Sequence, residues 1–208
     1  MKEKVLGHID GVAVALLLLL CMAFSGLDLL LAQYFQTLNS QLLLIRLYKC
    51  LDVLGEPQWY LIPILCVCVF RFRQNYAVSR RLWYIFTMVA VVGVVANFCK
   101  WLLGRARPSL YFSEHVVGFA PKWLSYDALY MSFPSGHSAV VFAFAFACGL
   151  VFPRYRWWAL CFAILIASSR VVLVWHYFSD VIAGALLAHV ICHGCYARLC
   201  SDRPGQSR

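Results

Sequence analysis

Residues 82–107 read LWYIFTMVAVVGVVANFCKWLLGRAR, an apolar run that ends in a group of cations. Its apolar part, Leu82–Leu103, is long enough to form a membrane-spanning helix, which needs about 20 residues. Working outward along the chain, five further runs qualify as candidate spans: Gly11–Leu31, Gln58–Phe70, Ser138–Phe152, Trp157–Leu173 and Tyr177–Leu199. The sequence therefore predicts an all-α, polytopic membrane bundle of about six transmembrane helices.

The composition agrees with this class. The chain has 208 residues, of which 63% are hydrophobic and 13% charged, whereas soluble domains carry about 25% charged residues. The net charge of +9 is divided into small groups between apolar runs, which argues against a nucleic-acid surface. We expect one membrane domain over residues 1–208, with a motif-bearing core at about 82–199 and a polar tail at 201–208.

The distribution of cations predicts an orientation. With the N-terminus in the cytoplasm, eleven of the 18 Lys and Arg residues lie on the cytoplasmic side and seven on the other. Cytoplasmic loops carry the excess of positive charge in membrane proteins. Both termini are therefore expected in the cytoplasm, and the three motifs described below face the exterior.

The N-terminal segment raises two questions. Lys2, Lys4 and the apolar core before Ala23-Phe24-Ser25 resemble a signal peptide, but the apolar pattern continues to Leu31, which favours a retained helix. Asp28 either makes a polar contact between helices or marks the outer end of this helix. The second interpretation is favoured.

The first motif places two cations seven residues apart, Lys100 and Arg107, just before Pro108. On a continuous helix they share one face, about two turns apart, and Pro108 disfavours further helix at Arg107. Such a pair either holds an anion or snorkels to headgroups. Arg105 has no partner at this spacing, so we expect it to contact lipid headgroups. Its loss should change kcat of any reaction at this site only a few-fold.

The second motif, Pro134-Ser135-Gly136-His137, directly precedes an apolar run and so lies at a helix N-terminus. Unpaired backbone N–H groups and the helix dipole favour an anion there. Ser135 can donate a hydrogen bond to a ligand or cap the helix, Gly136 permits close approach, and His137 can give a proton. Taken alone, Pro-Ser-Gly is also ordinary turn chemistry.

The third motif runs from Ser169-Arg170 to His176 and Asp180. His176 and Asp180 are four residues apart, hence neighbours on one helix face. A carboxylate bonded to one imidazole nitrogen fixes the tautomer and leaves the other nitrogen able to attack. A stabilising polar pair is the alternative. Arg170 lies six residues before His176, so the two meet only if the chain turns between the spans.

Two other segments are less specific. The stretch between Gly104 and Phe133 carries six aromatic residues and is either an interfacial loop or a lid over the site. Near the C-terminus a group of Cys and His side chains matches no closed zinc pattern, and we expect no metal there. Its members are His189, Cys192, His193, Cys195 and Cys200.

In combination, the three motifs resemble the type 2 phosphatidic acid phosphatase family, the lipid phosphate phosphatases that share an active-site plan with vanadium haloperoxidases. The resemblance implies a haloperoxidase-like helical core without metal or organic cofactor. It makes His176 the nucleophile, Asp180 its orienting partner and His137 the acid for the leaving group. It assigns phosphate binding to five residues: Lys100, Arg107, Ser135, Gly136 and Arg170.

The expected activity is hydrolysis of a terminal phosphate or diphosphate on an envelope lipid through a phosphohistidine. Phosphatidic acid, phosphatidylglycerol phosphate, undecaprenyl diphosphate and lipid A phosphate all remain candidates. Alternatives are a lipid phosphotransferase using the same histidine, a vanadate haloperoxidase, and a non-enzymatic protein that binds lipid phosphate. We expect a bacterial inner-membrane location, with the lipid substrate and the bilayer as partners, and no nucleic acid or obligate protein partner.

Overall fold

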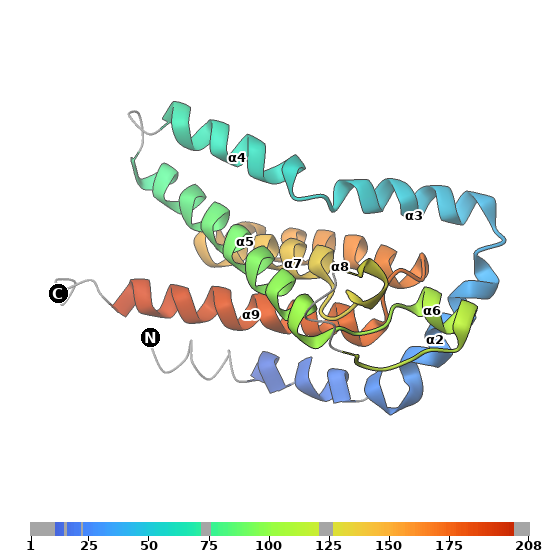
Figure 1. The fold of residues 1–208 in the computed structure, drawn as a ribbon. Helices are drawn as coiled ribbons and strands as arrows, with labels where there is room; N and C mark the ends of the chain where they lie inside the picture. The colour runs from blue at the N-terminus through green and yellow to red at the C-terminus, as the bar shows by residue number, and fades with distance from the viewer. Residues whose placement is uncertain (1–10, 15, 22, 72–75, 121–126, 202–208) are drawn as a thin grey trace.

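The structure is a computed structural model that describes residues 11–14, 16–21, 23–71, 76–120 and 127–201. Several residues considered above lie outside these ranges: Lys2, Lys4, the tail after residue 201, and two of the aromatic residues between Gly104 and Phe133, namely Trp123 and Tyr126. Figure 1 shows a bundle of long helices with shorter helices gathered at one end. The elements after residue 22 are η1 (Ala23–Leu27), α2 (Asp28–Leu38), α3 (Leu42–Leu54), α4 (Gln58–Arg71), α5 (Tyr76–Leu103), α6 (Pro108–Glu114), η2 (Ala128–Tyr130), α7 (Gly136–Val151), η3 (Pro153–Tyr155), α8 (Arg156–Val172) and α9 (Phe178–Ser201).

The all-α membrane architecture is confirmed. Four segments within the described ranges are long and apolar enough to cross a bilayer, and two shorter apolar helices accompany them. The long segments are Leu42–Phe70, Val78–Leu103, Pro153–Val172 and Phe178–Arg198, and the short ones are Gly11–Cys21 and Gly136–Val151. The chain is therefore an integral membrane protein, and about six spans is an approximate count.

Helix α7 forms the centre of the bundle and packs against α5, α8 and α9. Its buried positions are mostly alanines, and Ala139, Ala143 and Ala147 have no exposed surface. Small residues let membrane helices approach closely. At Gly184 of α9 a Cβ atom would lie 2.7 Å from the Ser135 carbonyl oxygen, so only glycine fits where α9 meets the N-terminus of α7.

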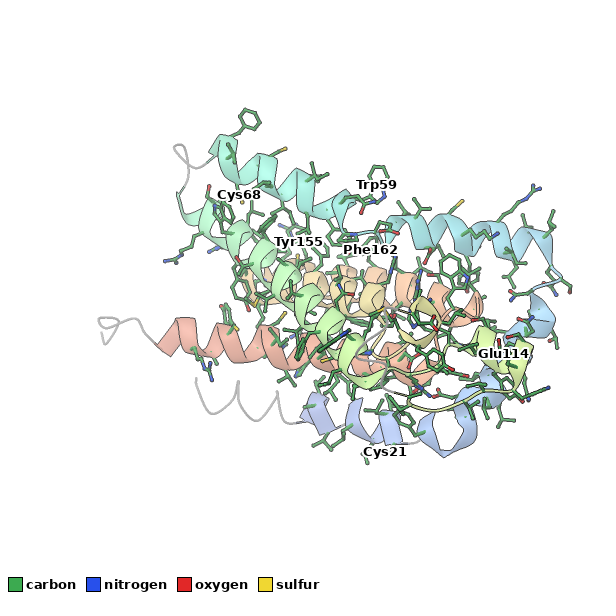
Figure 2. All side chains as sticks on the ribbon, viewed as in Figure 1. Cys21, Trp59, Cys68, Glu114, Tyr155 and Phe162 are labelled. Atoms are coloured by element: carbon green, nitrogen blue, oxygen red, sulfur yellow. The ribbon has the colours of Figure 1, made fainter. Side chains whose placement is uncertain are left out.

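Helix α3 (Leu42–Leu54) was not among the predicted spans. It packs against α8 and continues into α4 after a break at Gly55–Pro57, and Figure 1 shows the two helices along one side of the bundle. Leu42 and Leu43 on α3 are exposed, and Trp59 of α4 points away from the other helices in Figure 2. These apolar surfaces suit contact with lipid.

The helix ends fix where the chemistry lies. Helices α5 and α8 end, and α7 and α9 begin, at the end of the bundle that carries α6 and the α2–α3 turn (Figure 1). All three sequence motifs are located there. The opposite end carries the exposed cations Arg80, Arg154 and Arg156.

Candidate active site

The turn between α8 and α9 places Arg170 beside His176. The backbone N–H groups of Trp175 and His176 each donate to the Arg170 carbonyl oxygen, at 3.1 Å. Val174 adopts the left-handed conformation, with φ of 57°, which is uncommon for a β-branched residue. The chain thus reverses tightly between the two spans, and the six-residue spacing becomes a direct contact.

His176 and Asp180 form a buried pair at the start of α9. The imidazole Nδ1 lies 3.5 Å from Asp180 Oδ2. The same carboxylate oxygen accepts hydrogen bonds from the Tyr177 backbone N–H at 2.9 Å and from Ser132 Oγ at 2.5 Å. Ser132 Oγ also lies 3.4 Å from Nδ1. Sequence reasoning missed Ser132, because it stands two residues before the quoted motif and a lone serine carries no signal.

The surroundings of His176 favour its neutral form. Burial lowers the pKa of His176 from 6.5 to about 3; the hydrogen bond with Asp180 opposes this lowering, and the charges of Lys100 and Arg170 add to it. A neutral imidazole with one nitrogen beside a carboxylate retains a lone pair on the other nitrogen. The ring is therefore chemically suited to act as a nucleophile near neutral pH.

The N-terminus of α7 lies against α9 and the end of α5. The Ser135 hydroxyl accepts hydrogen bonds from the backbone N–H and the hydroxyl of Ser138, so it caps the helix. The Ser135 N–H donates to the Asp180 carbonyl oxygen at 2.9 Å. A Cβ atom on Gly136 would lie 3.3 Å from Lys100 Nζ. The Lys100 ammonium thus stands next to the helix end where an anion is favoured.

The prediction that Lys100 and Arg107 share one helical face was wrong. Helix α5 ends at Leu103, and Gly104 takes a left-handed conformation with φ of 59°, a conformation common just beyond helix ends. Arg107 is extended and precedes α6, and its Nε donates to the Ala128 carbonyl oxygen at 2.9 Å. Lys100 nevertheless lies close enough to Arg107 and Arg170 for their charges to interact.

Two carboxylates that sequence reasoning missed come from the end of α3 and the break that follows. Asp52 accepts a hydrogen bond from Arg170 Nη1. Glu56 Oε1 lies 3.3 Å from Nε2 of His137. The four-residue spacing of Asp52 and Glu56 before Pro57 was the available signal, but the charges in 42–54 kept this segment from being recognised as a span.

Arg105 is not a headgroup contact, and that prediction was wrong. Its side chain is 8% exposed and forms ion pairs with Asp180 Oδ1 at 2.5 Å and Asp28 Oδ2 at 2.8 Å. Four aromatic rings surround its guanidinium, those of Phe24, Phe119, Phe133 and Tyr177. The prediction failed because the two carboxylates are 77 and 75 residues distant in sequence.

Asp28 makes a polar contact rather than marking the outer end of its helix, so the favoured interpretation was wrong. The residue is 5% exposed and begins α2, which continues to Leu38. Asp28 Oδ1 accepts a hydrogen bond from the Ser179 backbone N–H at 2.8 Å, in addition to the ion pair with Arg105. The N-terminal part of the chain is thereby tied to the start of α9.

Four of the C-terminal Cys and His side chains pack within the bundle, namely His189, Cys192, His193 and Cys195. The His189 and His193 rings lie 4.1 Å apart and both contact Phe146 of α7, and buried Cys192 contacts the Ala143 carbonyl oxygen. Within the described ranges, no group of three or more His, Cys, Asp or Glu side chains is arranged to hold a metal ion.

This geometry can be compared with known proteins. Residues 81–199 match the family model of the PAP2 superfamily.

The chain belongs to the PAP2 superfamily.

The family resemblance drawn from the three motifs is therefore confirmed. Among curated PAP2 relatives, a lipid A 1-phosphatase from Rhizobium etli is 36% identical over 155 residues, which cover 67% of this chain and 64% of the relative. A lipid A 1-phosphatase from Rhizobium johnstonii is 45% identical over 101 residues, which cover 49% of this chain and 41% of the relative. The chain thus aligns with less than two thirds of either relative's length.

The fold is similar to that of a solved PAP2 protein. A transmembrane PAP2-type phosphatidylglycerolphosphate phosphatase from Bacillus subtilis superimposes with a TM-score of 0.59 over 94% of this chain and 98% of that one. The two are 21% identical in sequence. The likeness shows a shared bundle architecture.

Proposed function

We propose that this PAP2 protein is a membrane lipid phosphatase that acts as a single domain through a phosphohistidine on His176. The observation that carries the proposal is the buried His176–Asp180 pair. It lies within the electrostatic reach of Lys100 and Arg170. A protein that only binds lipid phosphate needs cations but has no use for an oriented, neutral imidazole.

In the first step, Nε2 of His176 bonds to phosphorus while the bond from phosphorus to the lipid oxygen breaks. His137 gives its proton to that oxygen. In the second step, water attacks phosphorus, the phosphorus–nitrogen bond breaks, and His137 takes the proton of the water. Inorganic phosphate and the lipid alcohol leave, and both imidazoles return to their starting states.

The cations supply the electrostatic stabilisation in this scheme. The transition state of phosphoryl transfer spreads charge over three equatorial oxygens, and fixed donors in a water-poor site stabilise it. We assign this role to Lys100, Arg107, Arg170, the Ser135 hydroxyl and the backbone N–H of Gly136. Asp52 is paired with Arg170 in this state, so an arriving phosphate competes with Asp52 for that guanidinium.

We propose the lipid A 1-phosphate as the first substrate to test, because the two Rhizobium relatives are named for it. Phosphatidic acid, phosphatidylglycerol phosphate and undecaprenyl diphosphate carry terminal phosphates as well and remain candidates. The cation distribution supports an orientation with Arg80, Arg154 and Arg156 in the cytoplasm and the site on the outer side. This orientation fits our proposal of a bacterial inner-membrane protein.

Phosphate release tests the proposal. Purified protein in detergent is assayed with the four lipids, with and without a metal chelator. We expect release from at least one lipid at the same rate in chelator, because cations of the protein supply the charge. The His176→Ala variant should be inactive, and the control His115→Asn should retain wild-type activity, since His115 is exposed just after the end of α6. Activity that disappears in chelator and returns with magnesium contradicts the metal-independent mechanism.

A further inference from the structure

Arg105 lies behind Asp180, on the opposite carboxylate oxygen from His176. We propose that Arg105, anchored by Asp28, is a positioning residue that fixes the Asp180 carboxylate so that it orients His176. The inference rests on the proposed function for its kinetic consequence. It assigns a role in the chemistry to the N-terminal part of the chain, which lies outside residues 81–199 of the family match.

The two oxygens of Asp180 have separate partners. Oδ1 accepts from Arg105 Nη1 at 2.5 Å. Oδ2 accepts from Ser132 and from the Tyr177 N–H, and it faces His176 Nδ1. The carboxylate therefore cannot rotate toward another partner without breaking a charge-assisted hydrogen bond, which is among the stronger kinds. Arg105 thereby keeps Oδ2 directed at the imidazole.

Arg105 is itself held from several directions. Its Nη2 donates to Asp28 Oδ2 at 2.8 Å, and Ser179 Oγ bonds to both Arg105 and Asp28. Ser179 directly precedes Asp180, so this network closes on the first turn of α9. The guanidinium also lies between the rings of Phe24 and Tyr177, whose centroids are 4.8 and 4.5 Å away.

These contacts give Arg105 a different role from that of the cations proposed to bind phosphate. Two carboxylates engage its guanidinium, and the side chain is buried. An arginine held in this way cannot swing to a substrate. A buried ion pair is a weak source of net stability, because desolvation offsets the attraction between the charges. A role in orienting Asp180 gives this costly arrangement a function.

The first test is kinetic. Arg105→Gln should lower kcat by about 10²-fold, because displacing a catalytic group by about 1 Å costs this much, while KM for the lipid and inhibition by inorganic phosphate stay within twofold to threefold. Arg105→Lys should recover part of kcat. The control Arg154→Gln, at the opposite end of the bundle, should match the wild type.

A second variant separates positioning from folding. Asp28→Asn combined with Arg105→Gln removes both charges of the Arg105–Asp28 pair, so neither residue of that pair is left as an unpaired charge. Asp180 loses Arg105 but keeps its hydrogen bonds from Ser132 and the Tyr177 N–H. Thermal unfolding in detergent should return toward the wild-type midpoint, yet kcat should stay low. If kcat recovers together with stability, Arg105 has only a structural role and the proposal is overturned. A well-folded Arg105→Gln variant with wild-type kcat overturns it as well.

A spectroscopic experiment tests the positioning role without measuring turnover. In protein with ¹⁵N-labelled histidine, NMR should show His176 as a single tautomer protonated at Nδ1, and a mixture of tautomers in Arg105→Gln. An unchanged tautomer contradicts positioning even if the enzyme is active. A changed tautomer in a protein that releases phosphate from none of the four lipids supports positioning while rejecting the proposed function.

A cavity of about 130 Å³ lined by Asp28, Arg105 and Tyr177 should also let free guanidinium ion restore part of the activity of Arg105→Ala.

Discussion

The two histidines of the site have contrasting surroundings. His176 is 2% exposed, and its carboxylate partner Asp180 is fully buried and bound by several donors. The side chain of His137 is 24% exposed and its partner Glu56 is 41% exposed, joined by one contact of 3.3 Å. The comparison fits a division of labour. A nucleophile benefits from a fixed, water-poor setting, whereas a proton donor must meet the leaving group and later water.

The largest expected effect concerns the buried pair of His176 and Asp180. Asp180→Asn should lower kcat by about 10⁴-fold, because an amide in place of the carboxylate no longer holds the reactive tautomer of a catalytic histidine. The measurement is steady-state phosphate release, with Glu114→Gln on the exposed surface of α6 as the control. A loss of only a few-fold means that Asp180 does not orient the nucleophile.

The role of the more exposed His137 is tested by comparing substrates with different leaving groups. His137→Ala should lower kcat by about 10²-fold to 10⁴-fold with a lipid substrate, the range for general acid catalysis. The loss should be much smaller in the phosphorylation of His176 by p-nitrophenyl phosphate, since that leaving group needs little protonation. The check is the rate of the nitrophenol burst. Equal losses of the burst rate and of lipid turnover contradict the assignment of His137 as the acid.

The buried imidazole also predicts a dependence of stability on pH. Because the pKa of His176 falls from 6.5 to about 3 in the folded state, the unfolded chain binds the additional proton between these values. Stability should therefore rise with pH from about 3 to 6.5. Over the part of this range in which the protein stays folded in detergent, thermal unfolding of the wild type should show a steeper slope than that of His176→Gln. Parallel slopes contradict a buried, neutral His176.

Glu56 should have the smallest effect of this series. Exposed ion pairs contribute at most about 1 kcal/mol, which corresponds to about fivefold in rate. Glu56→Gln should lower kcat by no more than this amount, and the assay is again steady-state phosphate release beside Glu114→Gln. A loss as large as that of Asp180→Asn removes the contrast between the two histidines.

The part of the site that follows from local sequence was predictable. His176 and Asp180 are neighbours because they are four residues apart on one helix, and Ser135 lies at a helix start because an apolar run follows it. Another local prediction was wrong because Gly104 takes a left-handed conformation and ends the helix, so Lys100 and Arg107 do not share a face. The bundle itself followed from the apolar runs.

The contacts that sequence could not supply join distant segments. Asp28 pairs with Arg105 across 77 residues, and Asp52 pairs with Arg170 across 118. Which carboxylate meets which cation depends on how the helices pack, and no spacing rule encodes that. Helix α3 was overlooked for a related reason, because Arg46, Lys49 and Asp52 interrupt its apolar pattern and the structure brings Asp52 to Arg170.

The central claim is that His176 carries the phosphoryl group. The most direct measurement uses whichever of the four lipids releases phosphate, with ³²P in its terminal phosphate. The reaction is stopped during turnover under alkaline conditions that preserve phosphohistidine. The account predicts label on the peptide that contains His176, absent in His176→Ala and present at wild-type levels in His115→Asn. Rapid phosphate release with no label on that peptide, or with label on His137 instead, contradicts it.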